Sequence, residues 1–282
     1  MSSAARQART VQIGMIGGHL ACLAAWETGV STVALVTAGV AYVVRAFGVT
    51  AGFHRLLAHG AFKVGRGMQF ILALLGSLAT QGGPLWWVSH HRNHHRYSDT
   101  PKDVHSPRHR GFWYSHMGWM WDKSSFESPG TNVKELHRFP EIKALQRHYP
   151  LLVVGQAVAF YALGVVLNYY FPDLGTSGAQ MLIWGFVIST VALWHATFMV
   201  NSVCHVWGER AYESGDTSTN NPLVAFLTLG EGWHNNHHKF AYSARHGLEW
   251  WQIDPTWIGL RILGAVGLVS DLKLPRRIMA TP

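Results

Sequence analysis

Histidines gather in two short segments of this chain that share one spacing. The first is Ser89-His90-His91-Arg92-Asn93-His94-His95 and the second is His234-Asn235-Asn236-His237-His238. Each contains the pattern His-x-x-His-His, which on a helix places three imidazoles on one narrow arc. Protonated imidazoles so close together would repel one another, so the pattern favours neutral rings whose lone pairs bind a metal.

A third pair, His54 and His59, lies upstream of both segments. The competing interpretation of any one segment is a solvated histidine-rich surface. Two copies of one spacing and a third pair, in a hydrophobic chain, favour metal binding instead. Five residues correspond to about 140° around an α-helix. His54 and His59 therefore share a metal only if the helix end opens or both side chains reach inward.

The composition indicates a membrane protein. Of 282 residues, 48% are hydrophobic and 13% are charged, against roughly a quarter charged in an ordinary soluble domain. The net charge of +8 forms no basic stripe beside stacking aromatic residues, which argues against nucleic-acid binding. Cys22 and Cys204 lie in apolar surroundings and form no Cys-x-x-Cys motif, so neither a disulfide nor a thiolate metal site is expected.

Four apolar runs are long enough to cross a membrane in two hairpins. They cover about residues 11–27, 31–51, 151–171 and 179–200. Residues 1–10 are predicted to be a short polar tail. Arg45 lies inside the second run, where a charge at the bilayer centre would cost about 3 kcal/mol. It is therefore expected to lie near the interface, to snorkel there, or to pair within the protein.

A fifth apolar stretch, 68–88, is interrupted by Gly and Pro residues. If it crossed the membrane once, the His54 and His59 pair would lie on the opposite face from the 91–95 segment. We therefore expect a buried or re-entrant segment. All 23 Lys and Arg residues except Arg45 lie before residue 11, within 52–150 or after 200. This distribution predicts that both termini and the histidines are cytoplasmic.

The expected fold is all-α: a single domain over 1–282 with four transmembrane helices in two hairpins. A cytosolic helical cap, built from 52–150 and 201–282, would hold the histidine-rich site. The Ile258–Val269 run is too short to span and is expected to pack on the protein or lie on the membrane.

With these motifs in place, the chain resembles the membrane fatty-acid desaturases. That family carries His-x4-His, His-x-x-His-His and His-x-x-His-His boxes, which His54–His59, His91–His95 and His234–His238 match. The flanking Gly48-Val49-Thr50-Ala51-Gly52 and Gly230-Glu231-Gly232-Trp233 resemble the acyl-CoA and acyl-lipid delta-9 desaturase branch. The run from Ser243 to Asp254 is closer to the bacterial and plant members of that branch.

The resemblance implies a non-haem di-iron oxygenase. Such an enzyme uses two Fe2+ ions, O2 and two external electrons to introduce a cis double bond, here delta-9, into a saturated fatty acyl chain. An unactivated C–H bond cannot be attacked by a side-chain acid or base, so a redox metal is required, and imidazole suits Fe(II). The metal ligands implied by the resemblance are His54, His59, His91, His94, His95, His205, His234, His237 and His238, with Asn201 acting through a water.

The resemblance also implies residues around the metals. Those expected to line a substrate tunnel are Tyr42, Trp86, Trp87 and Thr197, with Tyr42 near the closed end. Those expected to support the ligand imidazoles from behind are His90, Asp99, Asp103 and Glu231. His195 is expected to be a buried, hydrogen-bonded residue within its span. His19, His137, His148 and His246 carry no predicted role.

Two other functions stay open at this point. One is a hydroxylase or other oxygenase on the same scaffold. The other is a histidine-rich membrane metal transporter, although its spans would offer only Glu27, Arg45 and His195 as ionisable groups. The acyl carrier, the favoured chain length and the oligomeric state also stay open.

Electrons are expected from a separate ferredoxin or cytochrome b5-like protein, since the sequence shows no haem, flavin, nicotinamide or Fe–S motif. A basic cytosolic surface is expected to bind this acidic donor. Its residues are Lys102, Arg108, Arg110 and Lys123.

Overall fold

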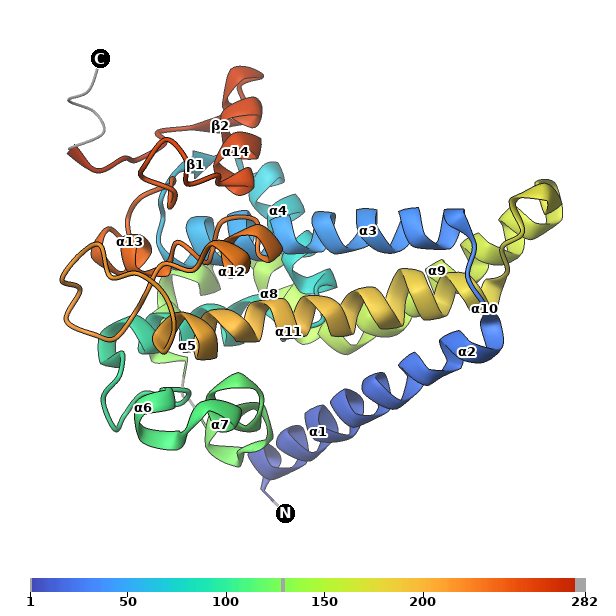
Figure 1. Cartoon of the computed structure of the whole chain (residues 1–282), viewed down its shortest axis with the longest axis horizontal. Coiled ribbons are helices and arrows are strands. Elements are labelled where there is room, and N and C mark those ends of the chain that lie inside the picture. Colours follow the sequence, from blue (N-terminus) through green and yellow to red (C-terminus); the bar gives the residue numbers. More distant parts are fainter. Residues whose placement is uncertain (1, 128–129, 277–282) are drawn as a thin grey trace.

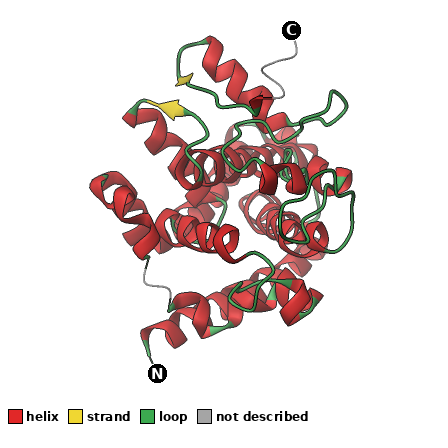
Figure 2. Cartoon of the chain, turned by 90° about the vertical axis from the view of Figure 1, so that its left-hand side faces the viewer, coloured by secondary structure: helices red, strands yellow, loops and turns green. Residues whose placement is uncertain are grey.

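The computed structural model describes residues 2–127 and 130–276, and it is largely helical (Figures 1 and 2). The long helices are α1 (Ser3–Ala21), α3 (Thr32–Phe47), α4 (Arg66–Leu78), α5 (Pro84–Tyr97), α9 (Tyr149–Tyr170), α11 (Ser189–Ser202) and α14 (Pro255–Ala265). Shorter helices are α2 (Ala25–Thr28), α6 (Pro107–Arg110), α7 (Phe112–His116), α8 (Pro140–Arg147), α10 (Gly178–Gln180), α12 (Pro222–Leu227) and α13 (His234–Lys239).

Several helical segments depart from α geometry. The π-helical segments are η2 (Gly48–Ala58) and η7 (Met181–Ile188). The 3-10 segments are η1 (Cys22–Ala24), η3 (Gly118–Trp121), η4 (Lys123–Phe126), η5 (Thr131–Arg138), η6 (Pro172–Leu174) and η8 (Val203–His205). The all-α expectation misses one small element, an antiparallel pair of two-residue strands, β1 (Lys63–Val64) and β2 (Val269–Ser270).

Three helical runs among the described residues are long and apolar enough to cross a membrane. They are Thr32–Ala58, Tyr149–Tyr170 and Gly178–His205, close to three of the four predicted spans. On α9 only Gly164 is buried, and Leu151, Val154 and Val158 are more than 60% exposed. A helix that is apolar all round and unburied is suited to contact with lipid.

The fourth predicted span, 11–27, lies in α1, η1 and α2, and it stays a prediction. The prediction of a polar tail over 1–10 is wrong, because α1 begins at Ser3. The hydroxyl of Ser2 accepts a bond from the Ala5 amide at 3.2 Å and caps this helix, which satisfies a free N–H of its first turn.

The link of the first helical hairpin lies against the beginning of the last predicted span, α10 and η7. Gln180 Nε2 donates to the Thr28 carbonyl at 2.8 Å, and Trp184 Nε1 donates to the Gly29 carbonyl at 2.9 Å. In Figure 1 this end of the molecule lies opposite the end that carries α5 and α13. The histidine-bearing helices therefore share one end of the bundle.

The stretch 68–88 is divided between two helices. The 13-residue α4 is short of the roughly 20 residues that a span needs. The chain then turns through Thr80 and Gly82, both with positive φ, and α5 begins with Pro84. Proline suits the first helical position because its missing N–H would have no helical partner there.

The first histidine pair is positioned by close packing of η2 on α4. A Cβ on Gly48 would lie 2.3 Å from the backbone nitrogen of Gly76, and one on Gly52 would lie 2.4 Å from the Leu72 carbonyl oxygen. Small residues four apart let two helices approach at backbone distance. This contact fixes the depth of the next turn, which carries His54.

Candidate metal centre

The structure brings all nine predicted histidine ligands together at one end of the bundle. They form two sets whose ligand atoms lie within 4.8 Å of one another. The first cluster consists of His54, His59, His91, His95 and His237, and the second cluster consists of His94, His205, His234 and His238.

Each His-x-x-His-His segment contributes to both clusters. His91 and His95 of α5 belong to the first cluster, whereas His94 between them belongs to the second. In α13, His234 and His238 belong to the second cluster and His237 to the first. Residues four apart therefore stay together, and the remaining histidine faces the neighbouring site.

The ring nitrogens within each cluster lie at distances that suit a shared metal. In the first cluster, Nε2 of His237 lies 3.0 Å from Nε2 of His54 and 2.9 Å from Nε2 of His95. In the second, Nε2 of His205 lies 3.1 Å from Nε2 of His234. Ligands bound at about 2.1 Å, the usual metal–imidazole length, would be separated by about 3.0 to 3.4 Å around an octahedral or tetrahedral ion.

The hydrogen bonds that the imidazoles make through Nδ1 also favour metal binding. Nδ1 of His94 contacts Asp103 at 3.0 Å, and Nδ1 of His238 contacts Asp216 at 2.5 Å. A neutral imidazole that donates through Nδ1 carries a lone pair on Nε2. These two Nε2 atoms nevertheless face each other at 3.3 Å. A cation between them removes that repulsion, so the residues fit a metal ion.

A π-helical turn explains how His54 and His59, five residues apart, reach the same cluster. The backbone N–H of His59 donates to the His54 carbonyl at 3.2 Å, the i→i+5 bond that defines this geometry. The wider turn brings residues five apart onto one face. The two imidazole centroids are 4.9 Å apart, so the helix does not have to open.

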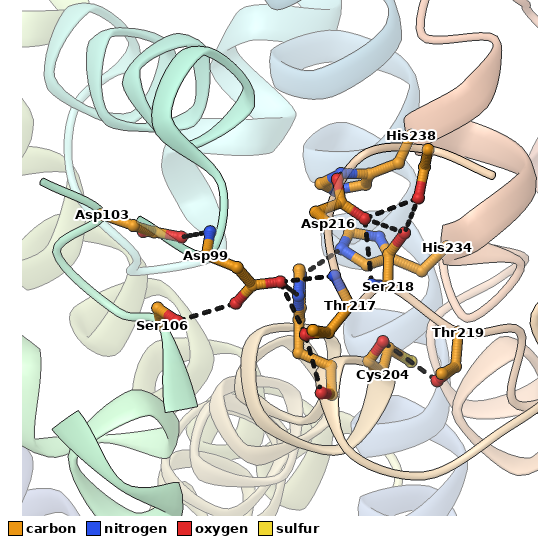
Figure 3. A network of polar contacts seen from close by, with 12 residues as sticks. Asp99, Asp103, Ser106, Cys204, Asp216, Thr217, Ser218, Thr219, His234 and His238 are labelled. Atoms are coloured by element: carbon orange, nitrogen blue, oxygen red, sulfur yellow. Dashed lines mark hydrogen bonds and ion pairs between the residues drawn. The ribbon is translucent and has the colours of Figure 1, made fainter. Parts of the chain in front are cut away.

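Carboxylates orient most of the second cluster. Asp99 Oδ2 accepts from Nδ1 of His205 at 2.9 Å and from the backbone N–H of Thr217 at 2.7 Å. Figure 3 shows Asp99 between Ser106 and the loop that carries Thr217. Burial opposes ionisation of Asp99, but the bonds from His205 and Thr217 outweigh it and lower its pKa. An ionised Asp99 fixes the tautomer and direction of His205.

Asp216 has the same relation to His238, although it was not among the predicted site residues. Its other oxygen accepts from the Ser218 amide at 3.0 Å and from the Ser214 hydroxyl at 2.7 Å (Figure 3). Burial opposes the ionisation of Asp216, yet the bond from His238 outweighs it and lowers its pKa. The run Ser214-Gly215-Asp216-Thr217-Ser218 is a turn-forming sequence, which is a weak signal from which no ligand partner can be read.

Glu231 supports the first cluster within a buried charged network. Its Oε2 lies 2.5 Å from Nδ1 of His54, and its Oε1 lies 3.1 Å from Nη2 of Arg55. Arg55 is fully buried and also contacts both oxygens of Asp254 at 3.0 Å. Arg55, itself anchored by Asp254, thus holds Glu231 in place, and neither residue was among the predicted site residues.

His246, to which no role was assigned, also belongs to this region. It is 1% exposed, and its ring centroid lies 4.4 Å from that of His237 and 5.3 Å from that of His54. Its Nδ1 lies 3.5 Å from Glu231. A further group of side chains that could hold a metal ion consists of His54, Glu231 and His246.

Burial keeps most of the ligand imidazoles neutral, whereas at His94 the attraction of Asp103 outweighs the effect of burial and raises the pKa. Burial lowers the pKa of His91, His95, His234 and His237 well below the ordinary value of 6.5. It lowers the pKa of His238 to about 4. Only an unprotonated imidazole nitrogen can bind a metal, so these rings are ready ligands at neutral pH.

An apolar cavity opens onto both clusters. Its walls include Ala46, Val49, Leu193 and Val200, and His54, His91, His94 and His234 border it. A second cavity shares Trp87, His91, Thr197 and Asn201 with the first. Asn201, the predicted water-mediated ligand, therefore lies where the two cavities meet the histidines.

Three of the four predicted tunnel residues line these cavities. Trp87 and Thr197 line both, and Trp86 lines the second beside Trp119. Tyr42 does not line either cavity. It packs against the cluster that contains Ala46 and Leu193, and its hydroxyl donates to the Leu227 carbonyl at 2.7 Å.

His90 and His195 lie outside both clusters. His90 does not contact a ligand carboxylate. Its Nε2 bonds to the Ser125 carbonyl at 2.7 Å and its ring packs on Trp86, at the second cavity. His195 is partly buried and hydrogen-bonded, since its two nitrogens lie 2.9 Å from His19 and 3.0 Å from His116.

Comparison with known proteins agrees with this geometry. Residues 31–263 match the family model described as fatty acid desaturase. The chain is 44% identical over 240 residues to the palmitoyl-monogalactosyldiacylglycerol delta-7 desaturase of Arabidopsis thaliana, covering 84% of this chain and 61% of that protein. It is 45% identical over 232 residues to the icosanoyl-CoA 5-desaturase of Limnanthes douglasii, covering 81% and 61%.

The sn-1 stearoyl-lipid 9-desaturase of Anabaena variabilis is 42% identical over 234 residues, which cover 83% of this chain and 81% of that protein. The chain spans about three fifths of the length of the two plant relatives. The match to the family model covers most of the sequence and includes all three histidine boxes. The chain therefore belongs to the fatty acid desaturase family.

Proposed function

We propose that this chain is an O2-dependent fatty-acyl desaturase that introduces a cis double bond, at delta-9, into a saturated acyl chain. The observation that carries the proposal is the division of nine histidines, five of them buried and four partly buried, into two clusters that border one apolar cavity. Such a site suits a hydrocarbon substrate held beside two metal ions.

The histidine clusters, the apolar lining residues and the carboxylates would each have a separate role. Two irons bound by the clusters would supply the one-electron and O2 chemistry that no side chain can supply. Val49, Leu193 and Val200 would hold the acyl chain by its methylenes and exclude water. The carboxylates of Glu231, Asp99, Asp103 and Asp216 would keep the imidazoles directed at the metals.

The proposed position of the double bond rests on the positions named for the relatives. The cyanobacterial relative is named a 9-desaturase of a lipid-bound stearoyl group, which supports delta-9. The two plant relatives are named for delta-7 and delta-5 positions and for glycolipid and CoA carriers. We therefore propose a fatty acyl substrate, on a lipid or on CoA, and leave the carrier to experiment.

We further propose a multi-pass membrane topology with four spans, including 11–27. Both hairpin links, 28–31 and 172–178, would face away from the cytoplasm, and both termini and the metal centre would face it. The absence of Lys and Arg from these links supports that orientation. A Val30→Cys or Gly175→Cys variant should react with a membrane-impermeant maleimide added outside intact cells, whereas a Lys239→Cys variant should not.

A separate electron donor is proposed to bind the basic surface formed by Lys102, Arg108, Arg110 and Lys123. All four residues are exposed, and an acidic ferredoxin or cytochrome b5-like protein would be attracted to them. Reversing two of these charges should raise the donor concentration needed for half-maximal turnover. Unchanged donor dependence would contradict this assignment.

Product analysis tests the proposed reaction. The chain is expressed in a host that lacks desaturase activity, and each lipid fraction is examined by mass spectrometry after double-bond derivatisation. A loss of two hydrogens at carbons 9 and 10 is expected. An added oxygen would instead identify a hydroxylase, and a double bond elsewhere would correct the position. Growth with iron depleted should abolish the product.

A further inference from the structure

His246 is a fully buried imidazole whose hydrogen bonds are not made. Its side chain is 1% exposed, and among the described residues neither ring nitrogen has a hydrogen-bond partner. A buried polar group without partners destabilises a fold. Where one is kept in a native structure, it usually serves a site or an ion. The position of this ring therefore requires a functional explanation.

Two hydrogen bonds of its backbone fix where the ring of His246 lies. The His246 N–H donates to Oδ2 of Asp254 at 2.7 Å, and the His246 carbonyl accepts from Nδ2 of Asn236 at 2.9 Å. Asn236 belongs to α13 and directly precedes His237, a ligand of the first cluster. Asp254 also contacts Arg55. The loop that carries His246 is thus tied to the third histidine segment and to the buried charged network.

The ring lies behind the first cluster rather than within it. Its centroid is 4.4 Å from that of His237 and 5.3 Å from that of His54, yet His246 is not among the five histidines whose ligand atoms gather there. It groups instead with Glu231 and His54. His54 directs Nε2 toward His237 and Nδ1 toward Glu231. His246 therefore joins the group on the Nδ1 side of His54, opposite the nitrogen that faces the cluster.

Charge disfavours a third metal ion between His54, Glu231 and His246. Oε1 of Glu231 lies 3.1 Å from Nη2 of Arg55, a fully buried cation. A second cation at the same carboxylate would be repelled by this guanidinium in surroundings that screen charge weakly. A hydrogen bond from a neutral imidazole to Glu231 adds no charge, so it suits this group better than a metal ion.

Glu231 offers His246 an acceptor within reach. Nδ1 of His246 lies 3.5 Å from Oε2 of Glu231, the oxygen that contacts Nδ1 of His54 at 2.5 Å. A movement of about half an ångström would bring the longer contact to hydrogen-bond length. A carboxylate oxygen has two lone pairs, so Oε2 can accept from both imidazoles. The second bond would hold Oε2 where it directs His54.

We propose that His246 is a positioning residue of the metal centre, whose Nδ1–H donates to Glu231 and keeps that carboxylate directed at His54. His246 would act on the metal that the proposed function requires, so the assignment rests on that function. The rings that His246 contacts, His54 and His237, both belong to the first cluster. Loss of the donor should therefore weaken the first site and leave the second unchanged.

Iron release from purified protein tests this assignment without measuring turnover. Wild-type and variant proteins loaded with two equivalents of iron are mixed with a chelator, and the absorbance of the chelate reports the release of each equivalent. His246→Phe keeps an aromatic ring but removes the donor. We expect one equivalent to leave about tenfold faster, the low end of the usual effect of losing such a partner. The other equivalent should leave at the wild-type rate.

Two amide variants separate the hydrogen bond from the packing of the ring. The amide nitrogen of Asn can take the position of Nδ1, whereas that of Gln reaches the position of Nε2. His246→Asn should therefore retain iron better than His246→Gln. His19→Phe is the matched control, because it removes an imidazole that bonds to the Met15 carbonyl at 2.6 Å and to His195 at 2.9 Å, outside both clusters. Its iron release should equal that of wild type.

A Glu231→Gln background shows whether His246 acts through this carboxylate. His246→Phe should accelerate iron release less in that background than in the wild-type one, because the charged acceptor is already lost. Equal acceleration in both backgrounds would overturn the assignment. Wild-type release from His246→Phe protein would also overturn it, and so would faster release of both equivalents, which indicates a general loss of structure.

The remaining outcomes are also decisive. A third equivalent of iron in wild type that His246→Phe protein lacks would identify a metal site instead of a positioning residue. If His246→Phe protein does not fold, equal release from the His246→Asn and His246→Gln proteins overturns the assignment. Wild type that holds two irons but forms no double bond would contradict the proposed function alone.

Discussion

His59 donates its backbone N–H to the carbonyl of His54 across a π-helical turn, at 3.2 Å. This bond makes residues five apart neighbours on one face, so both imidazoles reach the first cluster. The turn persists because Gly48 and Gly52 let η2 lie against the backbone of α4. The packing of two helices thereby determines the geometry of a candidate metal ligand pair.

Gly52→Ala should therefore damage the metal centre. The new Cβ would lie 2.4 Å from the Leu72 carbonyl oxygen, and overpacking of this kind costs about 1–3 kcal/mol. We expect a lower unfolding temperature and loss of iron, measured by thermal unfolding in detergent and by metal analysis. Gly39→Ala, in α3 with nothing within 4 Å of its added Cβ, is the control and should keep both. Full iron content in Gly52→Ala protein would contradict this explanation.

The second prediction concerns Asp216, which orients His238 through a 2.5 Å contact. Asp216→Asn keeps the shape but removes the charge that favours the correct tautomer. Loss of such a partner usually weakens metal binding by about 10–100-fold. Iron retained after a timed challenge with a chelator measures the change, and Asp173→Asn in the exposed link after α9 should behave as wild type. Equal iron retention in the two variants would show that Asp216 does not support the metal centre.

The buried network around Arg55 should contribute far more to stability than a surface pair of similar geometry. Asp254→Asn leaves the Arg55 charge with one carboxylate fewer in a buried site, at a cost of about 3–5 kcal/mol. Glu141→Gln breaks the pair with the exposed Arg66, made through two contacts of 2.7 and 2.8 Å, and should lower the unfolding temperature much less, because water screens an exposed pair. Thermal unfolding compares them, and shifts of equal size would show that Arg55 is not an internal support.

The periodicity of the sequence indicates which histidines are metal ligands, but not which of the two clusters each one joins. The pattern His-x-x-His-His places His91, His94 and His95 on one arc of a helix. Which of them faces which metal depends on how η2, η8 and α13 approach α5, and this is a property of tertiary packing. The same limit applies to His54 and His59, whose π-helical turn arises from contact with α4 rather than from local propensity.

The supporting groups were predictable only where sequence placed them beside a histidine segment. Asp99, Asp103 and Glu231 are acidic residues within nine residues of a ligand and were identified, whereas His246, eight residues after His238, carries no charge that would mark it as a partner. Asp216, Asp254 and His246 reach the site from loops, where neither spacing nor periodicity fixes direction. Three of the four predicted spans coincide with long apolar helical runs, Thr32–Ala58, Tyr149–Tyr170 and Gly178–His205, because run length and apolarity are read directly from the chain.

The last prediction concerns pH. Burial lowers the pKa of His91, His95, His234 and His237 well below 6.5, and that of His238 to about 4. Below pH 6.5 the unfolded chain therefore binds protons that the folded chain does not, and acidification favours unfolding. The unfolding temperature of iron-free protein should be nearly constant above about pH 7 and should decline as the pH falls through 6.5 toward 4.

Bound iron should add to this dependence, because protons compete with metal for the same nitrogen atoms. Iron retention should hold across neutral pH and fail only well below 6.5. A double variant in which His137 and His148 become Gln removes histidines outside both clusters and should leave the curve unchanged. A protein whose unfolding temperature rises on acidification from pH 7 to 5 would not contain the neutral, buried imidazoles described here.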